Sequence, residues 1–200
     1  MKLIYFSPTD TTKNVLDVIV KELNIPIEKE YNLTNYEFKD FSYQFKNEII
    51  VLGFPVYSGR VPKTALNRFK NITGNNSKMI ICTTFGNRDY DNALMEIFEL
   101  FLKNGFDIIG MCACVTTHSI VNSIGKNRPN KDDYDIIKSF CKNILNKIND
   151  NYQGSIQYKI VEPFRKYQRL PIRPKGNNQC KKCGICVKNC PENAIIPEPI

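Results

Sequence analysis

The sequence predicts an α/β fold, a doubly wound parallel sheet followed by a short cysteine-rich module. Two observations predict the sheet: apolar runs of strand length recur along the chain, and amphipathic helical segments separate most of them. A third observation, four closely spaced cysteines near the C-terminus, predicts the module. We therefore expect a first domain at 1–150, a basic, proline-containing linker at 151–178 and a cysteine module at 179–200.

Five segments are expected to form strands: 2–6, 27–33, 48–54, 78–84 and 107–115. Most are almost continuously apolar, which is typical of parallel strands that are buried on both faces. The segment 27–33 is the weakest of the five. The aromatic segment 36–45 that follows it favours neither helix nor strand.

Four segments carry apolar residues at helical spacing: 11–24, 62–70, 91–104 and 133–149. In the third, Leu94, Ile97 and Phe101 lie on one stripe, and Gly105 provides a C-terminal stop. After about residue 151 this pattern ends. Prolines and basic residues then predict a linker that drapes over the first domain.

Composition narrows the class of protein. A hydrophobic content of 42% is enough for a core, and no apolar run is long enough to cross a membrane. The net charge of +8 and pI near 9.0 raise the question of nucleic acid, but the lysines are dispersed and no nucleic-acid-binding motif is present. We therefore expect an acidic redox partner protein rather than nucleic acid or a membrane. The oligomeric state is not predicted.

The eight cysteines fall into two groups. Without a secretory signal, they fit a reducing cytoplasm, where disulfides are rare. One group lies within apolar segments and is interpreted as buried thiols: Cys82, Cys112, Cys114 and Cys141.

The second group consists of Cys180, Cys183, Cys186 and Cys190, followed by Pro191. This C-x₂-C-x₂-C-x₃-C-P spacing is the bacterial ferredoxin signature and predicts a [4Fe-4S] cluster held by the four thiolates. A zinc knuckle or a disulfide staple is the alternative, but zinc sites usually separate two C-x₂-C halves by a long gap.

The fourth cysteine of such a run ligates the other cluster in two-cluster ferredoxins, and no second run follows here. One interpretation is a truncated half-ferredoxin module. The other is a single cluster whose fourth ligand is Cys190, another side chain, water or nothing. We favour truncation, which puts stable cluster assembly on this chain in question.

The loops after the strands carry the second candidate site, because ligands of open α/β sheets bind outside the carboxyl ends of the strands. The loop 7–14 is rich in hydroxyls and leads into a helix, which is typical of an anion site or of an ordinary helix cap. The loops 53–62 and 83–90 each combine an aromatic residue, a glycine and small polar groups. Together they predict a pocket for a planar ring with a phosphate tail.

The sequence resembles flavodoxin-like proteins that are fused to a ferredoxin module. The resemblance rests on Tyr5–Thr9 with Thr11–Lys13, on Gly53–Pro62, on Phe85–Arg88 and on the cysteine run, and it covers most of the chain. It implies a five-stranded sheet of order 2-1-3-4-5 and bound flavin mononucleotide (FMN).

The resemblance also implies which residues bind FMN. The phosphate donors would be Ser7, Thr9, Thr11 and Thr12, with Asp10, Lys13 and Asn14 in the same loop. The isoalloxazine ring would lie between Pro55, Val56, Tyr57, Ser58 and Gly59 on one side and Thr83, Thr84, Phe85, Gly86, Asn87 and Tyr90 on the other.

Asp10 departs from the family pattern, which usually has glycine at this position. Aspartate tolerates left-handed backbone angles, so the turn can form. Its carboxylate would repel a phosphate by about 1 kcal/mol at ~4 Å in water. We expect weakened flavin binding, unless Asp10 turns away to cap the helix or Lys13 offsets the charge.

Three further residues lie in or beside these loops. Arg60 and Arg88 are candidates to stabilise an anionic reduced flavin, or are simply solvated surface charges. His118, the single histidine, follows the fifth strand segment; it either faces the pocket or is a hydrogen-bonded structural residue.

The sequence thus predicts an electron-transfer flavoprotein that moves electrons between FMN and an iron–sulfur cluster or an external partner. It has no G-x-G-x-x-G fingerprint for a dinucleotide. A flavin-dependent reductase of a small substrate and a flavin-less scaffold or sensor are the alternatives.

Overall fold

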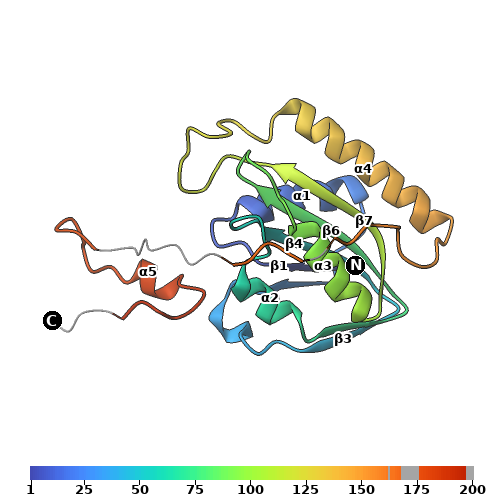
Figure 1. Cartoon of the computed structure of the whole chain (residues 1–200), viewed down its shortest axis with the longest axis horizontal. Coiled ribbons are helices and arrows are strands. Elements are labelled where there is room, and N and C mark those ends of the chain that lie inside the picture. The colour runs from blue at the N-terminus through green and yellow to red at the C-terminus, as the bar shows by residue number, and fades with distance from the viewer. Residues whose placement is uncertain (162, 168–175, 197–200) are drawn as a thin grey trace.

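A computed structural model describes residues 1–161, 163–167 and 176–196 of the chain. Its centre is a five-stranded parallel sheet in the order β2-β1-β4-β6-β7 (Figure 1). Counted along the chain, these five strands have the order 2-1-3-4-5, as expected. Their bounds are Lys2–Tyr5 for β1, Lys29–Asn32 for β2, Ile49–Pro55 for β4, Ser77–Phe85 for β6 and Phe106–Val115 for β7.

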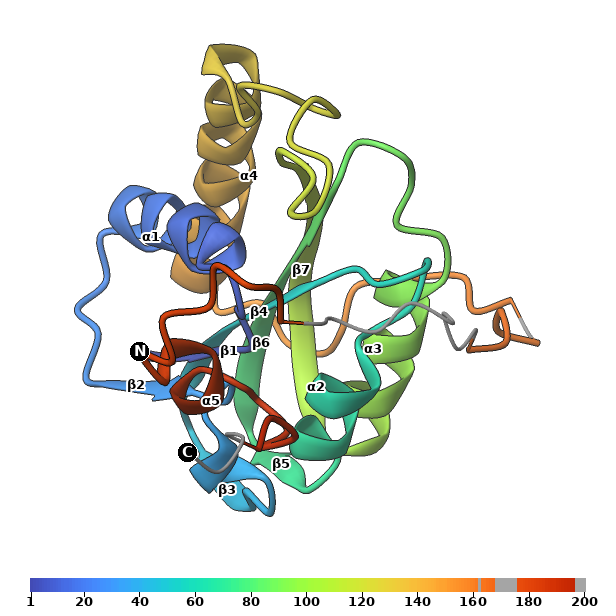
Figure 2. The same ribbon diagram turned by 90° about the vertical axis from the view of Figure 1, so that its left-hand side faces the viewer.

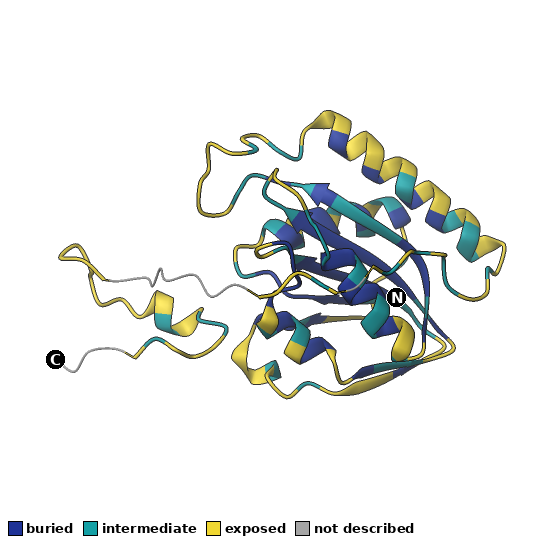
Figure 3. Ribbon diagram, viewed as in Figure 1, coloured by how far each residue is buried: buried dark blue, intermediate teal, exposed yellow. Residues whose placement is uncertain are grey.

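Helices cover both faces of the sheet (Figure 2). On one face lie α1 (Thr11–Leu23) and α4 (Lys131–Asn149), and on the other lie α2 (Lys63–Phe69) and α3 (Ala93–Lys103). Each face has its own apolar core, one built around Leu16, Ile19 and Ile144 and the other around Phe54, Phe69 and Phe101. The central strands β1, β4 and β6 are buried almost throughout, which explains their apolar sequence, whereas the edge strand β2 exposes Lys29 and Glu30 (Figure 3).

The segment between β2 and β4 differs from the expected strand–helix alternation. It holds a 3₁₀ turn at Tyr36–Phe38 and a strand, β3 (Tyr43–Lys46), which pairs in parallel with β5 (Ile72–Asn75) in a second sheet. Aromatic packing accounts for this: Phe45 is fully buried, and its ring meets that of Tyr31 edge-on at 5.8 Å. This segment was the one whose sequence pattern favoured neither state.

The chain after α4 returns across the other face of the sheet. Ile156 donates its backbone N–H to the carbonyl of Ile108 over 2.8 Å, and the ring of Tyr158 packs on that of Phe98. This part of the linker lies on the first domain as expected, although the three domain boundaries remain a prediction. The linker residues 162 and 168–175 lie outside the described residues.

The cysteine module follows and, in its described residues, carries a short helix, α5 (Ile185–Lys188), set apart from the helices of the sheet domain (Figure 1). Two contacts attach the module to α2. Arg68 of α2 donates to the carbonyl of Pro191, and Thr64 donates to the carboxylate of Glu192. No helix among the described residues is long and apolar enough to span a membrane.

Candidate functional site

The loops at the carboxyl ends of the strands enclose a cavity of about 620 Å³, a volume within the range of small-molecule sites. Ten of the eighteen predicted cofactor-binding residues line it: Thr9, Thr11, Thr12, Pro55, Val56, Tyr57, Ser58, Thr84, Phe85 and Gly86. The parallel strands bring these three loops to one edge of the sheet, as the sequence analysis expected.

The loop after β1 is held by its own hydroxyl groups. The Ser7 hydroxyl accepts the backbone N–H of Lys13 over 3.1 Å, and the Ser7 N–H donates to the Thr34 hydroxyl over 2.7 Å. The hydroxyls of Thr9 and Thr11 lie 3.2 Å apart at the surface. The hydroxyls of Thr9 and Thr11 thus lie at the end of the cavity where α1 begins, and hydroxyl donors there suit a phosphate.

Asp10 takes the left-handed conformation, with φ of 56°, as the sequence analysis expected. Its side chain is exposed and makes no capping hydrogen bond to α1, so the suggestion that it caps this helix is wrong. It lines a second cavity of about 470 Å³, together with Ser7 and the module residues Lys188, Asn189 and Cys190. Lys13 pairs with Asp17 over 2.6 Å.

The loop after β4 makes a tight hairpin turn at Ser58 and Gly59. Both have positive φ, 52° and 79°, and Tyr57 and Arg60 exchange backbone hydrogen bonds of 3.0 and 3.1 Å. This geometry is that of a type I′ turn, for which glycine is favoured. The turn presents the half-exposed ring of Tyr57 to the cavity.

The remaining predicted residues lie elsewhere. Lys13, Asn14, Gly59, Thr83, Asn87 and Tyr90 do not line either cavity in the described part of the chain. Thr83 is fully buried, and its hydroxyl donates to the Phe54 carbonyl over 3.0 Å. Tyr90 packs edge-on against Phe85, with ring centroids 5.7 Å apart, and so supports the cavity wall from behind.

Arg60 does not face the cavity, which corrects its suggested role beside a flavin. Its guanidinium is buried against the carboxylate of Glu96, with Nη2 and Oε1 2.6 Å apart. Arg88, the other arginine proposed for that role, pairs with Asp91 at the surface.

His118 lines the cavity, where its ring lies against Gly86. Its Nδ1 accepts the backbone N–H groups of Ile120 and Val121, each over 3.1 Å. In the neutral ring that these bonds require, Nε2 carries the proton and is the remaining donor. His118 therefore faces the pocket, the first of its two expected alternatives. The other cavity-lining residues of the loop after β7 were not predicted, although the strand-end rule applies to them equally: Thr116, Thr117, Ser119 and Ile120.

Comparisons with known proteins separate the two parts of the chain. Residues 176–196 match the family described as 4Fe-4S binding domain. The structure resembles a flavodoxin of Streptococcus pneumoniae TIGR4 with a TM-score of 0.52 and 14% identity, over 73% of this chain and 97% of that one. The chain joins a flavodoxin-like domain to a ferredoxin-type module.

Other relatives agree with this fold. A short-chain flavodoxin associated with a bacterial microcompartment has a TM-score of 0.50 and 15% identity, over 73% of this chain and 96% of that one. An apo NADH:FMN oxidoreductase has a TM-score of 0.50 and 9% identity, over 73% and 89%. In sequence, an uncharacterized protein of Methanocaldococcus jannaschii is 27% identical over 140 residues, 67% of this chain and 89% of that protein.

The ferredoxin-type module exposes its thiols. Cys180, Cys183 and Cys186 are exposed and Cys190 is half-buried, and Gly184 turns the chain before α5 with φ of 74°. The backbone N–H of Ala194 donates to Cys190 Sγ over 3.3 Å, the type of bond that tunes a cluster's potential. No three of these four thiols have their sulfur atoms within 4.8 Å of one another, so it is the sequence spacing and the family match that indicate an iron–sulfur cluster here.

The other thiols form a separate group inside the sheet domain. In the described part of the chain, Cys82, Cys112 and Cys114 alone form a set of three metal-ligating side chains with ligand atoms within 4.8 Å of one another. Hydrogen bonds to Cys112 and Cys114, together with burial, raise the pKa of the Cys82 thiol well above its ordinary value. Burial raises the pKa of Cys141 to about 12. Cys82, Cys114 and Cys141 are buried, as expected, whereas Cys112 is half-buried.

Proposed function

We propose that the protein is an electron-transfer flavoprotein in which FMN occupies the larger cavity and exchanges electrons with a [4Fe-4S] cluster on Cys180, Cys183, Cys186 and Cys190 or with an external partner. The observation that carries this proposal is the convergence of three strand-end loops on one cavity, in a chain that also holds a ferredoxin-type module. FMN exchanges one or two electrons and a cluster exchanges one, so the pair can connect two-electron and one-electron carriers.

The residues around the cavity have the chemistry that FMN requires, with hydroxyl donors at one end and aromatic and apolar side chains along its wall. Thr9 and Thr11 would donate hydrogen bonds to its phosphate at the N-terminus of α1. Tyr57 and Phe85 would pack against the flat ring, and the neighbouring Val56 and Pro55 would exclude water from it.

The attachment of the module supports transfer within the chain. Arg68 is buried in α2 and donates to the carbonyls of Leu33 and Thr34, over 2.5 and 2.8 Å, as well as to that of Pro191. One guanidinium thus ties the loop after β2 to the residue that follows the last cysteine. The second cavity lies between this module and the Ser7–Asp10 loop.

The test is anaerobic expression followed by assays of flavin, iron and sulfide on one sample. We expect about one flavin for each chain and a visible spectrum with both flavin and cluster bands. The variant Cys183→Ser should lose iron and sulfide and keep its flavin. A chain that retains no flavin after anaerobic purification and reconstitution with FMN would contradict the proposal.

His118 favours a second function, a flavin-dependent reductase of a small substrate. Its Nε2–H is the remaining donor of a neutral ring that lines the cavity, where a substrate above the flavin could accept a hydrogen bond from it. In that case His118→Gln would lower turnover of a quinone or nitroaromatic at least tenfold and leave reduction of a one-electron acceptor unchanged. Equal effects on both acceptors would exclude this role.

A further inference from the structure

Tyr167 reaches the cavity from outside the flavodoxin-like domain. It belongs to the linker, lies beyond the last sheet-domain helix and lines the larger cavity alongside Tyr57, Pro62 and Lys63. Its hydroxyl lies within donating distance of the Val61 carbonyl, at 2.9 Å, and of Glu96 Oε1, at 3.0 Å. The linker therefore contributes an aromatic side chain to a cavity that is otherwise built from strand-end loops.

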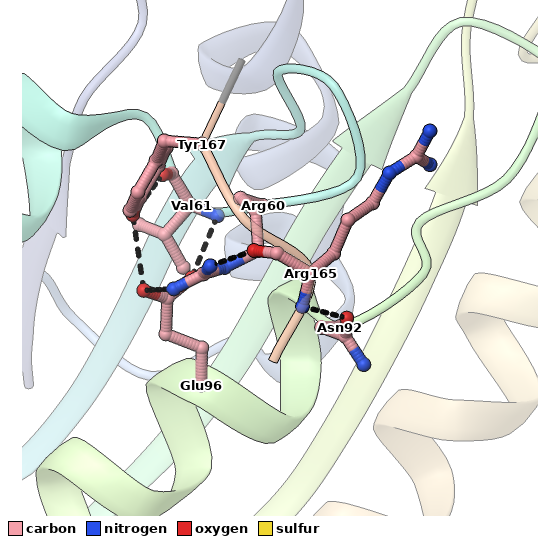
Figure 4. Close-up of polar contacts among 6 residues, drawn as sticks. All are labelled: Arg60, Val61, Asn92, Glu96, Arg165 and Tyr167. Atoms are coloured by element: carbon pink, nitrogen blue, oxygen red, sulfur yellow. Dashed lines mark hydrogen bonds and ion pairs between the residues drawn. The ribbon is translucent and has the colours of Figure 1, made fainter. Parts of the chain in front are cut away.

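The ring of Tyr167 packs against a buried ion pair between Arg60 and Glu96. Arg60 and Glu96 form two parallel bonds, Nε to Oε2 over 2.9 Å and Nη2 to Oε1 over 2.6 Å, and their side chains are only 9% and 6% exposed. Glu96 Oε2 also accepts the backbone N–H of Val61 over 3.1 Å. The guanidinium carbon lies 4.3 Å from the centre of the Tyr167 ring, a cation–π distance (Figure 4).

Arg165, two residues before Tyr167 in the linker, also contacts the sheet domain. The backbone N–H of Arg165 donates to Asn92 Oδ1 over 2.8 Å, and its guanidinium pairs with Asp91 over 3.0 Å. Arg60 in turn donates to the Arg165 carbonyl (Figure 4). Because the backbone N–H of Asn92 also donates to the Gly59 carbonyl, the linker, α3 and the hairpin after β4 form one connected network.

We propose that Tyr167 is a flavin-contacting residue supplied by the linker, and that Arg60 and Glu96 are the positioning residues that hold it against the cofactor. This inference rests on the proposed function. It assigns the two buried charges to the linker rather than to the flavin, and it makes the wall of the flavin cavity depend on the segment that leads to the ferredoxin-type module.

The ring is suited to this role. Its hydroxyl is committed to Val61 and Glu96, and 42% of the residue remains exposed, so the ring can meet a second flat ring. Burial and the nearby Glu96 carboxylate raise the pKa of the Tyr167 hydroxyl, which keeps it a neutral donor. We call the contacts of the Tyr167 hydroxyl with Val61 and Glu96 the tether, because they hold the linker on the sheet domain. Removing the hydroxyl alone should weaken the tether, and removing the whole ring should also expose the flavin.

The test compares Tyr167→Phe and Tyr167→Ala with the wild type and with Tyr134→Phe, a matched control at an exposed tyrosine of α4. Trypsin reports the tether in the absence of flavin, because Arg165 and Lys166 are cleavage sites within it. We expect cleavage at these two bonds to be at least fivefold faster in both Tyr167 variants and unchanged in the control. Equal cleavage rates in all four proteins would show that Tyr167 does not hold the linker on the sheet domain.

Flavin titration tests the contact itself. Tyr167→Ala should raise the FMN dissociation constant about tenfold and shift the visible flavin bands, and Tyr167→Phe should do less of both. Glu96→Gln should move the bands in the same direction without touching the flavin. If Tyr167→Ala binds FMN with wild-type affinity and unchanged bands, the residue is only a tether and the inference fails. If the wild type binds no FMN, the proposed function fails first.

Discussion

The hydroxyl oxygens of Thr12 and Thr84 lie 2.7 Å apart in the buried interior. This bond joins the first turn of α1, next to the candidate phosphate loop, to the end of β6, next to the candidate ring loop. Both residues also line the larger cavity. The two halves of the proposed FMN site are therefore connected directly by a side-chain hydrogen bond.

Thr84→Val should break this connection and leave the Thr12 hydroxyl without its partner. We expect a loss of about 1–3 kcal/mol in the free energy of unfolding, measured by urea denaturation, and FMN binding weakened by about tenfold. Thr83→Val is the matched control on the same strand, because it also removes a buried hydroxyl but lies outside the cavity. Equal loss of FMN affinity in the two variants would contradict the site.

Replacing Asp10 should strengthen FMN binding. Asp10→Asn removes the charge and keeps a residue that tolerates φ of 56°, whereas Asp10→Gly also relieves the backbone. We expect both variants to bind FMN about fivefold more tightly, from a repulsion of about 1 kcal/mol, and Asp10→Gly alone to gain stability. Titration of the apo-protein measures this, and unchanged affinity in both would remove the repulsion argument.

Breaking the buried ion pair should be costly. Glu96→Gln leaves the Arg60 guanidinium buried without a carboxylate, and we expect the free energy of unfolding to fall by about 3–5 kcal/mol. Glu99→Gln removes a carboxylate that pairs with the exposed Lys103 on the same helix and should cost less than about 1 kcal/mol. Chemical denaturation of the two variants side by side provides the measurement; similar losses would mean that the buried Arg60–Glu96 pair contributes no more to stability than the exposed pair.

The reactivity of the cysteines should divide them into the two groups. In the apo chain at pH 8, iodoacetamide should modify Cys180, Cys183 and Cys186 readily and leave Cys82 and Cys141 unmodified. Burial removes access to both, and the pKa is raised in Cys82 by hydrogen bonds to neighbouring thiols and in Cys141 by burial. Mass spectrometry of peptides locates the labels. Loading with iron and sulfide should protect the first group only, and early labelling of Cys141 would be inconsistent with its buried position.

The stability of the loop that carries His118 should depend on pH in the acid range. It is held at α4 by an ion pair between Arg128 and Asp133. Burial alone would raise the pKa of Asp133, but the Arg128 guanidinium and the Asn130 N–H lower it below 3.8. This contribution to stability is therefore complete above pH 3.8 and is lost as the pH falls through the lowered pKa.

Asp133→Asn should accordingly cost about 1–2 kcal/mol at pH 7, and the difference from the wild type should shrink below pH 3.8. Urea unfolding at several pH values tests this. A difference that stays constant down to pH 2 would show that the charge of Asp133 has no role.

Local pattern accounted for the main sheet and its helices. The apolar segment 78–84 became β6, and the amphipathic segment 91–104 contains α3, because burial on both faces or on one stripe leaves a periodic trace in the sequence. The pair β3 and β5 left no such trace. Each of these strands is only four residues long, too short to show a clear period. The aromatic packing that buries β3 joins Phe45 to Tyr31 of β2, and a local sequence pattern does not record such a contact between two strands.

For the site, the rule that ligands bind at strand ends located Thr9, Tyr57 and Phe85 at one cavity. It could not locate Tyr167, whose position follows from contacts with Val61 and Glu96, 106 and 71 residues away. Nor could it tell that Arg60 faces Glu96 rather than the cavity, because loop residues carry no periodic signal for the direction of a side chain.

The sequence by itself determined the fold class, the strand order through its family resemblance and the cysteine spacing of the module. These are properties of neighbouring residues, since periodicity, turn chemistry and ligand spacing all act over a few positions. Only the tertiary structure decided which polar groups meet: Thr12 with Thr84, Arg60 with Glu96 and both with Tyr167. Such pairs join distant segments, and their geometry depends on how the whole sheet brings its loops together.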